Sequence, residues 1–230
     1  MTPPRTDPAA DFSALGDDLG ELAGLVLAQV ERAVAGWDES DPTVAELVTA
    51  TDREVDLRSA ALEERILALH RNWATFAADL RLLHVGLIVA VALERVGNLA
   101  VQIARLAGSV PPPDPELDPV RTLIARMDER AVDALAQAVQ AVARGDVEAG
   151  ERAVRDANSV NPMLDRVMQA VTQAPSGPTM RAWSAAAVLV ARHVERVANN
   201  AAEIGARVRF LVTGETAPIE GEPPGTGTRE

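Results

Sequence analysis

Apolar residues recur at helical spacing along most of the chain. In the first such segment Leu15, Leu19 and Leu22 lie three or four positions apart, which places them on one helix face. No segment keeps the strict apolar–polar alternation of a half-buried strand. The pattern predicts six helices, at about Phe12–Gly36, Pro42–His70, Phe76–Ala107, Pro119–Arg144, Val147–Gln173 and Thr179–Val212.

Turn and cap residues mark the ends of these helices. Asp41-Pro42 is typical of a helix cap followed by a first-turn proline, and Gly145-Asp146 of a turn followed by a cap. Pro162 lies inside the fifth helix, where we expect a kink or a break because proline lacks the amide hydrogen.

A duplicated segment organises the chain into two halves. "ERVGNLAVQIA" begins at Glu94 and "ERVANNAAEIG" begins at Glu195, roughly a hundred residues later, each on the third helix of its half. We therefore predict an elongated all-α fold of two tandem three-helix bundles related by internal duplication. The expected boundaries are a flexible arm at 1–11, bundles at 12–108 and 119–213, a proline-rich linker at 109–118 and a disordered tail at 214–230.

Composition agrees with an all-helical fold and limits the function. Apolar residues make up 47% of the 230 residues, but aromatic residues only 3%, and small or straight aliphatic side chains suit helix packing better than sheets. The absence of cysteine excludes disulfides, thiolate metal sites and cysteine nucleophiles. A net charge of −12 argues against nucleic acid as a partner and favours a basic protein surface or a metal cation.

Nothing in the sequence predicts secretion or a membrane span. The start, "MTPPRTDPAADF", lacks a basic segment followed by an apolar one. The longest uncharged apolar stretch, Leu82–Leu93, is shorter than the roughly 20 residues that a membrane helix needs, so we expect a buried helix segment. We therefore expect a cytoplasmic protein.

Each duplicated segment carries a polar stripe of residues four positions apart, which share a helix face. The stripes are Glu94, Asn98 and Gln102 in the first half and Glu195, Asn199 and Glu203 in the second. Such oxygens could hold a hard cation if a neighbouring helix added more, and Asp52 and Asp56 are the best candidates. Asp156 and Asn161 on the fifth helix are worse spaced. From spacing alone we favour the simpler interpretation, in which Glu–Arg pairs and amides line a solvated helix face.

Other chemistry finds little support. There is no phosphate loop, nucleophile elbow or plausible triad, so we do not expect an enzyme. The chain lacks the Glu-x-x-His pattern of di-iron bundles, and we expect structural roles for the histidines, His70, His84 and His193. The tryptophans, Trp37, Trp73 and Trp183, lie near predicted helix ends and should cap the core, although Trp73 could instead bind a partner.

Three segments resemble the PhoU family of phosphate-uptake regulators: "AADLRLLHVGLIVAVALERVGNLAVQIARL", "HVERVANNAAEIGARV" and "RFLVTG". Asp79-Leu80-Arg81 matches the Asp-Leu-Arg that the family carries near the start of its third helix. Glu94-Arg95 and Glu195-Arg196 match the Glu-Arg that follows, and Arg209–Gly214 is similar to the ending of actinobacterial members. The resemblance spans residues from about Leu15 to Gly214.

The resemblance implies a pair of three-helix bundles without known catalytic activity. Such proteins are negative regulators of phosphate uptake and signalling, and they link a phosphate ABC transporter to a membrane sensor histidine kinase at the cytoplasmic face. We expect a homodimer, with Asp79, Arg81, Arg95 and Arg196 as candidate partner-binding residues. The alternatives are a metal-binding helical-bundle protein and a diverged paralogue that serves as a structural or oligomerisation module.

The resemblance also implies a possible metal site at the duplicated motif. Several family members bind iron or zinc clusters through Glu/Asp-x-x-x-Asp pairs, whose positions here are Glu94, Asn98, Glu195 and Asn199, with Asp52 and Asp56 as neighbours. Asparagine keeps one carbonyl oxygen but loses the charge of aspartate. Because both halves carry asparagine, we predict that iron or zinc binds weakly or not at all and that no cofactor is needed.

Overall fold

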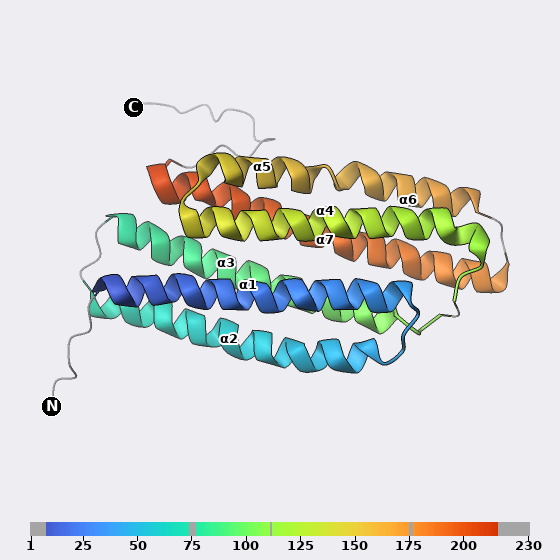
Figure 1. Cartoon of the computed structure of the whole chain (residues 1–230), viewed down its shortest axis with the longest axis horizontal. Coiled ribbons are helices and arrows are strands. Elements are labelled where there is room, and N and C mark those ends of the chain that lie inside the picture. Colours follow the sequence, from blue (N-terminus) through green and yellow to red (C-terminus); the bar gives the residue numbers. More distant parts are fainter. Residues whose placement is uncertain (1–7, 74–76, 111, 175–176, 216–230) are drawn as a thin grey trace, which may run out of the picture.

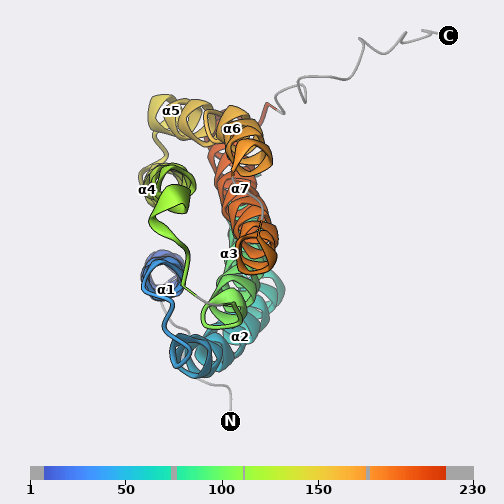
Figure 2. The same ribbon diagram turned by 90° about the vertical axis from the view of Figure 1, so that its right-hand side faces the viewer.

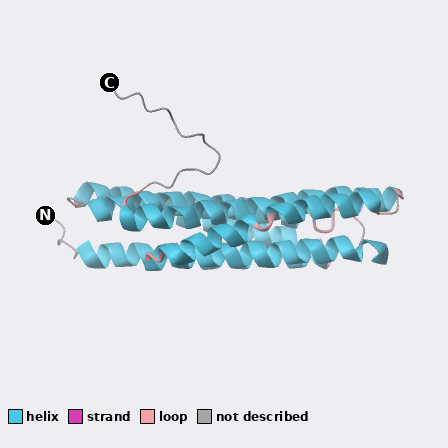
Figure 3. Ribbon diagram, turned by 90° about the horizontal axis from the view of Figure 1, so that it is seen from above, coloured by secondary structure: helices cyan, strands magenta, loops and turns pink. Residues whose placement is uncertain are grey.

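The computed structural model describes residues 8–73, 77–110, 112–174 and 177–215, and every regular element in these ranges is helical, as predicted (Figure 3). The elements are α1 (Pro8–Asp38), α2 (Val44–Asn72), α3 (Ala77–Leu106), the 3₁₀ helix η1 (Pro115–Leu117), α4 (Asp118–Arg144), α5 (Val147–Asn158), α6 (Asn161–Gln173) and α7 (Pro178–Thr213).

Two three-helix bundles lie side by side as an elongated, flat array (Figure 1). The first contains α1, α2 and α3, and the second contains α4, α7 and the α5–α6 pair. Seen from one end, α1 and α4 are neighbours in one layer, and α3 and α7 are neighbours in the other (Figure 2). The α2 helix closes one edge of the array and α5–α6 closes the other. The predicted fold class is therefore confirmed.

The predicted fifth helix is two helices. It breaks at Ser159 and Val160, between α5 and α6, and Pro162 lies in the first turn of α6, where its missing amide hydrogen has no partner to lose. Gly145 ends α4 with a φ of 62°, and the Asp146 side chain accepts a hydrogen bond from the Ala149 amide, which is the predicted turn and cap.

Three boundaries differ from expectation. The α1 helix begins at Pro8, so residues 8–11 of the expected arm are helical. The α2 helix begins at Val44, because Asp41 accepts bonds from the amide and hydroxyl of Thr43, both at 2.8 Å, and forms a turn before the helix. The expected linker contains η1 and the first residue of α4. Of the expected tail, residues 216–230 lie outside the described residues.

Small residues allow the helices of the second bundle to approach closely. A Cβ atom added to Gly150 of α5 would lie 2.8 Å from the Gly205 carbonyl oxygen of α7, and a Cβ added to Gly205 would lie 2.8 Å from the Gly150 carbonyl oxygen. Real Cβ atoms do not occupy such positions, so both residues must be glycine for this contact. Buried alanines continue the close packing along α4 and α7.

A stacked pair of tryptophans joins the two bundles at one end. Trp37 ends α1 and Trp183 begins α7, and their ring centroids lie 5.5 Å apart with an interplanar angle of 24°. Their exposed fractions are only 4% and 2%, so both occupy the core near helix ends, as expected. Trp73 differs, because it is half-buried and its indole N–H donates to Asp11 at 3.3 Å. The two bundles therefore share buried surface.

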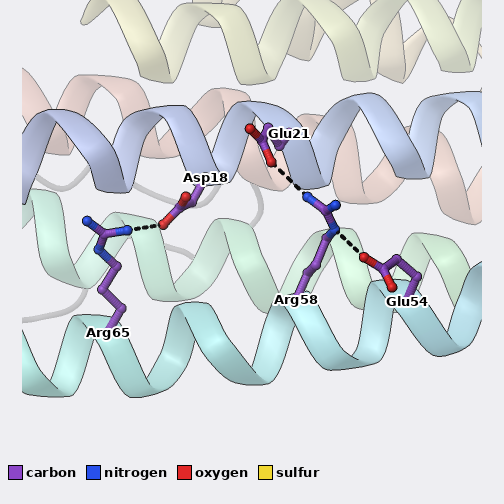
Figure 4. A network of polar contacts seen from close by, with 5 residues as sticks. All are labelled: Asp18, Glu21, Glu54, Arg58 and Arg65. Atoms are coloured by element: carbon purple, nitrogen blue, oxygen red, sulfur yellow. Dashed lines mark hydrogen bonds and ion pairs between the residues drawn. The ribbon is translucent and has the colours of Figure 1, made fainter.

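Ion pairs between α1 and α2 line an exposed edge of the first bundle (Figure 4). Arg58 pairs with Glu21 at 2.8 Å and with Glu54 at 2.7 Å, and Arg65 pairs with Asp18. These side chains are between about one-third and two-thirds exposed, so water and salt screen the attraction within each pair. The apolar core, and not this edge, therefore holds α1 against α2.

Among the described helices only α3 is long and apolar enough to cross a membrane. However, 61% of its most apolar window is buried within the bundle, against α1, α2 and α7. This burial fits the expectation of a core helix segment at Leu82–Leu93.

We predict that Trp183→Ala lowers the free energy of unfolding by about 3–5 kcal/mol, because it removes a buried ring and its stacking contact with Trp37. Urea denaturation followed by circular dichroism measures the loss. Trp73→Ala is the matched control and should cost less, since Trp73 is only half-buried. An equal loss in the two variants would contradict a special role for the stacked pair.

Candidate functional site

The duplicated motifs lie on α3 and α7, which pack antiparallel along a central seam. Three contacts define this seam: the Arg81 Nε donates to the Leu211 carbonyl oxygen at 3.0 Å, His84 meets Phe210 edge-on at 5.7 Å, and Arg95 pairs with Glu203 at 4.0 Å. Residue numbers rise along α3 as they fall along α7, which fixes the antiparallel direction. The motif helices therefore also join the two bundles.

In the first polar stripe the asparagine is bound to its own glutamate. The Asn98 side-chain amide donates to Glu94 Oε1 at 3.0 Å, and Asn98 is exposed. The amide nitrogen thus occupies one carboxylate oxygen that a metal ion would otherwise need. Asparagine at this position also brings a hydrogen-bond donor where aspartate would bring a second anionic acceptor.

The neighbouring Asp52 is part of the packing between α1, α2 and α3. Gln29, only 2% exposed, donates its side-chain amide to Asp52 Oδ1 at 3.1 Å and to the Val48 carbonyl at 3.2 Å. A Cβ added to Gly97 of α3 would lie 3.0 Å from the same Asp52 oxygen. Burial raises the pKa of Asp52, as does the charge of Asp56, while the Gln29 bond opposes the shift.

The second polar stripe has different surroundings. Glu195 is 8% exposed, and its Oε2 accepts a charge-assisted hydrogen bond from Arg192 Nη1 at 2.6 Å. Asn199 is exposed and forms no side-chain hydrogen bond within the described ranges. The duplicated glutamates therefore have different partners, Asn98 in one half and Arg192 in the other.

The structure does not assemble the ligand set of a metal cluster. Across residues 8–73, 77–110, 112–174 and 177–215, no three histidine, aspartate or glutamate side chains gather closely enough to hold a metal ion. The motif positions offer two asparagines, a glutamate tied to arginine and an aspartate tied to glutamine. This donor set does not fit a multinuclear iron or zinc cluster, which needs several anionic oxygens.

The four candidate partner-binding residues differ in their freedom to bind. Arg81 and Arg95 contact α7, so they have a structural role at the seam. Asp79 is half-buried in the first turn of α3. Arg196 is exposed, and its guanidinium forms no ion pair or hydrogen bond in the described part of the chain. Partner binding at these positions stays a prediction, and Arg196 is the best placed for it.

The histidines lie apart from one another. His84 packs on Phe210 at the seam, and His70 is exposed near the end of α2. Burial lowers the pKa of His193, and the nearby positive charge of Arg196 lowers it further. The neutral imidazole therefore predominates at pH 7, which fits the structural role that we expected.

Sequence reasoning missed a buried carboxyl group between α1 and α4. Asp128 Oδ1 is buried and has no hydrogen-bond partner in the described residues. Burial raises the pKa of Asp128 to about 7, and the negative charges of Glu31 and Glu129 add to the shift. The sequence held a signal, because Asp128 follows Met127 and lies four positions after Ile124, both of which are core residues. Sequence reasoning also missed that Arg126, Arg130 and Arg166 line one pocket, because this depends on how α4 and α6 pack.

Comparison with known proteins gives the family. A sequence model of the PhoU domain matches residues 19–107 and again residues 124–208, once in each bundle. The chain belongs to the PhoU family. Each domain match covers one copy of the duplicated motif, so the internal repeat is a repeat of the PhoU domain.

Named PhoU relatives match along nearly the whole chain. The chain is 28% identical over 210 residues to phosphate-specific transport system accessory protein PhoU homolog 2 of Mycobacterium tuberculosis, covering 91% of this chain and 98% of that protein. The PhoU accessory protein of Escherichia coli is 22% identical over 207 residues, with 90% and 85% covered.

Solved PhoU structures share the fold. The crystal structure of PhoU from Pseudomonas aeruginosa superposes with a TM-score of 0.78 at 22% identity, covering 91% of this chain and 100% of that one. PhoU from Streptococcus pneumoniae superposes with a TM-score of 0.80 at 18% identity, covering 93% and 100%. The two-bundle PhoU architecture is therefore retained at low identity.

We predict that this PhoU protein, purified without chelators, carries less than about one iron or zinc per chain, because Asn98 and Asn199 provide no anionic ligand. Elemental analysis by mass spectrometry measures the content. Asn98→Asp with Asn199→Asp restores two carboxylates, and Asn200→Asp is a matched single-charge control. Stoichiometric multi-iron content in the wild type would contradict the prediction. No gain in the double variant would show that the site has degenerated beyond these two positions.

We predict that Asp128→Asn stabilises the protein at pH 8 but hardly changes it at pH 4. The folded-state pKa lies near 7, above the ordinary 3.8, so wild-type stability falls as the pH rises from about 4 to about 7. The expected gain at pH 8 is about 1–4 kcal/mol. Urea denaturation at both pH values measures it, with the exposed Asp133→Asn as control. A gain of the same size at pH 4 would rule out the protonation mechanism.

Proposed function

We propose that this PhoU-family chain is a non-enzymatic accessory protein of phosphate transport that negatively regulates phosphate uptake and signalling in the cytoplasm. The observation that carries the proposal is the pair of PhoU domains, one in each bundle. It is supported by relatives named as phosphate-specific transport system accessory proteins, which this chain matches over at least 90% of its own length.

In this proposal the protein is an adaptor between a phosphate ABC transporter and a membrane sensor histidine kinase, at the cytoplasmic face of the membrane. Long helices packed in two layers present extended, rigid faces for such docking. The net charge of −12 complements the lysine- and arginine-rich cytoplasmic loops of membrane proteins. Regulation would then come from which partner occupies a helix face, without any chemical step. We also propose a homodimer, which the mass of the protein in solution would test.

Two alternatives receive less support. A metal-binding bundle protein would need clustered ligands, but the motif side chains are tied to Asn98, Arg192 and Gln29. A diverged paralogue acting as an oligomerisation module would form filaments or large assemblies. The same measurement of mass in solution separates that module from a monomer or dimer.

We predict that deleting the gene raises phosphate uptake in phosphate-rich medium, because a negative regulator is lost. Uptake of radiolabelled phosphate and expression of phosphate-starvation genes measure the response. Complementation with the wild-type gene should restore repression. The substitution Arg196→Glu tests the exposed motif arginine, and Arg181→Glu is an exposed control on the same helix. An unchanged response to phosphate in the deletion strain would overturn the proposed function.

A further inference from the structure

A pocket of about 530 Å³ is lined by residues of α4, of α6 and of the junction between α5 and α6. Arg126 and Arg130 of α4 line it from one side, and Arg166 of α6 lines it from the other. Ser159, at the break between α5 and α6, and the core residue Met163 also line it. The pocket therefore lies at the helix break, where α5 ends and α6 begins beside α4.

The three guanidinium groups lack carboxylate partners in the described part of the chain. Arg126 and Arg166 form no ion pair or hydrogen bond there, although the chain has 34 acidic residues for 22 basic ones. Arg130 donates one N–H to the Ser159 hydroxyl at 3.0 Å. The other four of its five N–H donors can bind a ligand. The Ser159 hydroxyl in turn donates to the Asp156 carbonyl at 2.6 Å and so holds a fixed position.

The nearby carboxylates do not neutralise this cluster. In the adjoining hollow Asp38 and Asp118 are bound to Arg121, at 2.9 and 3.2 Å. Glu129 lines the arginine pocket but is exposed and forms no ion pair with the three arginines. The C-terminal end of α5 and the N-terminal end of α6 meet here, so their opposite dipole ends largely cancel. The charged side chains that line the pocket are therefore three arginines and one glutamate.

We propose that this pocket binds a phosphate group, either as inorganic phosphate or as a phosphomonoester. Each guanidinium presents a planar fork of N–H donors that matches two oxygens of a tetrahedral oxyanion. Three such forks from two helices line the same pocket, and Arg126 and Arg166 have no intramolecular bonds in the described residues to break. The Ser159 hydroxyl keeps the Arg130 guanidinium in place. Glu129 sets the affinity, because its negative charge opposes the bound anion.

Isothermal titration calorimetry of the full chain tests the proposal, with inorganic phosphate and O-phosphoserine as ligands and chloride at matched ionic strength as reference. Phosphate should bind with a Kd of about 1 mM or tighter. Arg126→Gln with Arg166→Gln should weaken binding at least about tenfold, since each charge-assisted bond contributes that much or more. Glu129→Gln should strengthen it, a gain that a folding defect would not produce.

The control variant is Arg32→Gln with Arg152→Gln, which removes the same charge at two exposed arginines outside the pocket. Its affinity should stay within about twofold of wild type, since neither arginine lines the site. Binding of O-phosphoserine without inorganic phosphate would assign the pocket to phosphomonoesters. Equal affinity in all variants, the same response to chloride, or no binding of either phosphate ligand would overturn the proposal. The test needs no transporter or kinase, so its failure leaves the regulatory function standing.

Discussion

Burial of apolar helix faces between the two bundles is the constraint on which the rest of this structure depends. A three-helix bundle needs one apolar stripe on each helix, but α1, α3, α4 and α7 must also pack on the neighbouring bundle. Small side chains meet this demand, because glycine and alanine allow a helix to contact several neighbours closely. The stack of Trp37 on Trp183 and the bond from Arg81 to Leu211 lie on the same interface.

The duplicated Glu-Arg motif lies on the two helices, α3 and α7, that carry this packing. The motif helices lie at the seam, where Arg95 pairs with Glu203 across the two halves. Glu94 is bound to Asn98, whereas Glu195 is nearly buried beneath Arg192, so the duplicated copies have acquired different local roles.

The net charge of this protein does not describe its local charge distribution. A chain with a net charge of −12 nevertheless gathers three arginines in one pocket and buries one oxygen of Asp128 without a partner. Asp128 and two of the arginines, Arg126 and Arg130, lie on α4, and Arg166 comes from α6. A chain with a net negative charge can therefore still present a pocket lined by arginines.

The sequence by itself determined the helices, the caps at Gly145-Asp146 and the internal duplication, because each depends on residues close together in the chain. It also predicted an interruption near Pro162, although the break lies at Ser159 and Val160. Only the tertiary structure decided that Gln29 donates a hydrogen bond to Asp52. It also decided that Arg126, Arg130 and Arg166 line the same pocket. These outcomes depend on the register and rotation of helices from distant segments, which local spacing does not fix.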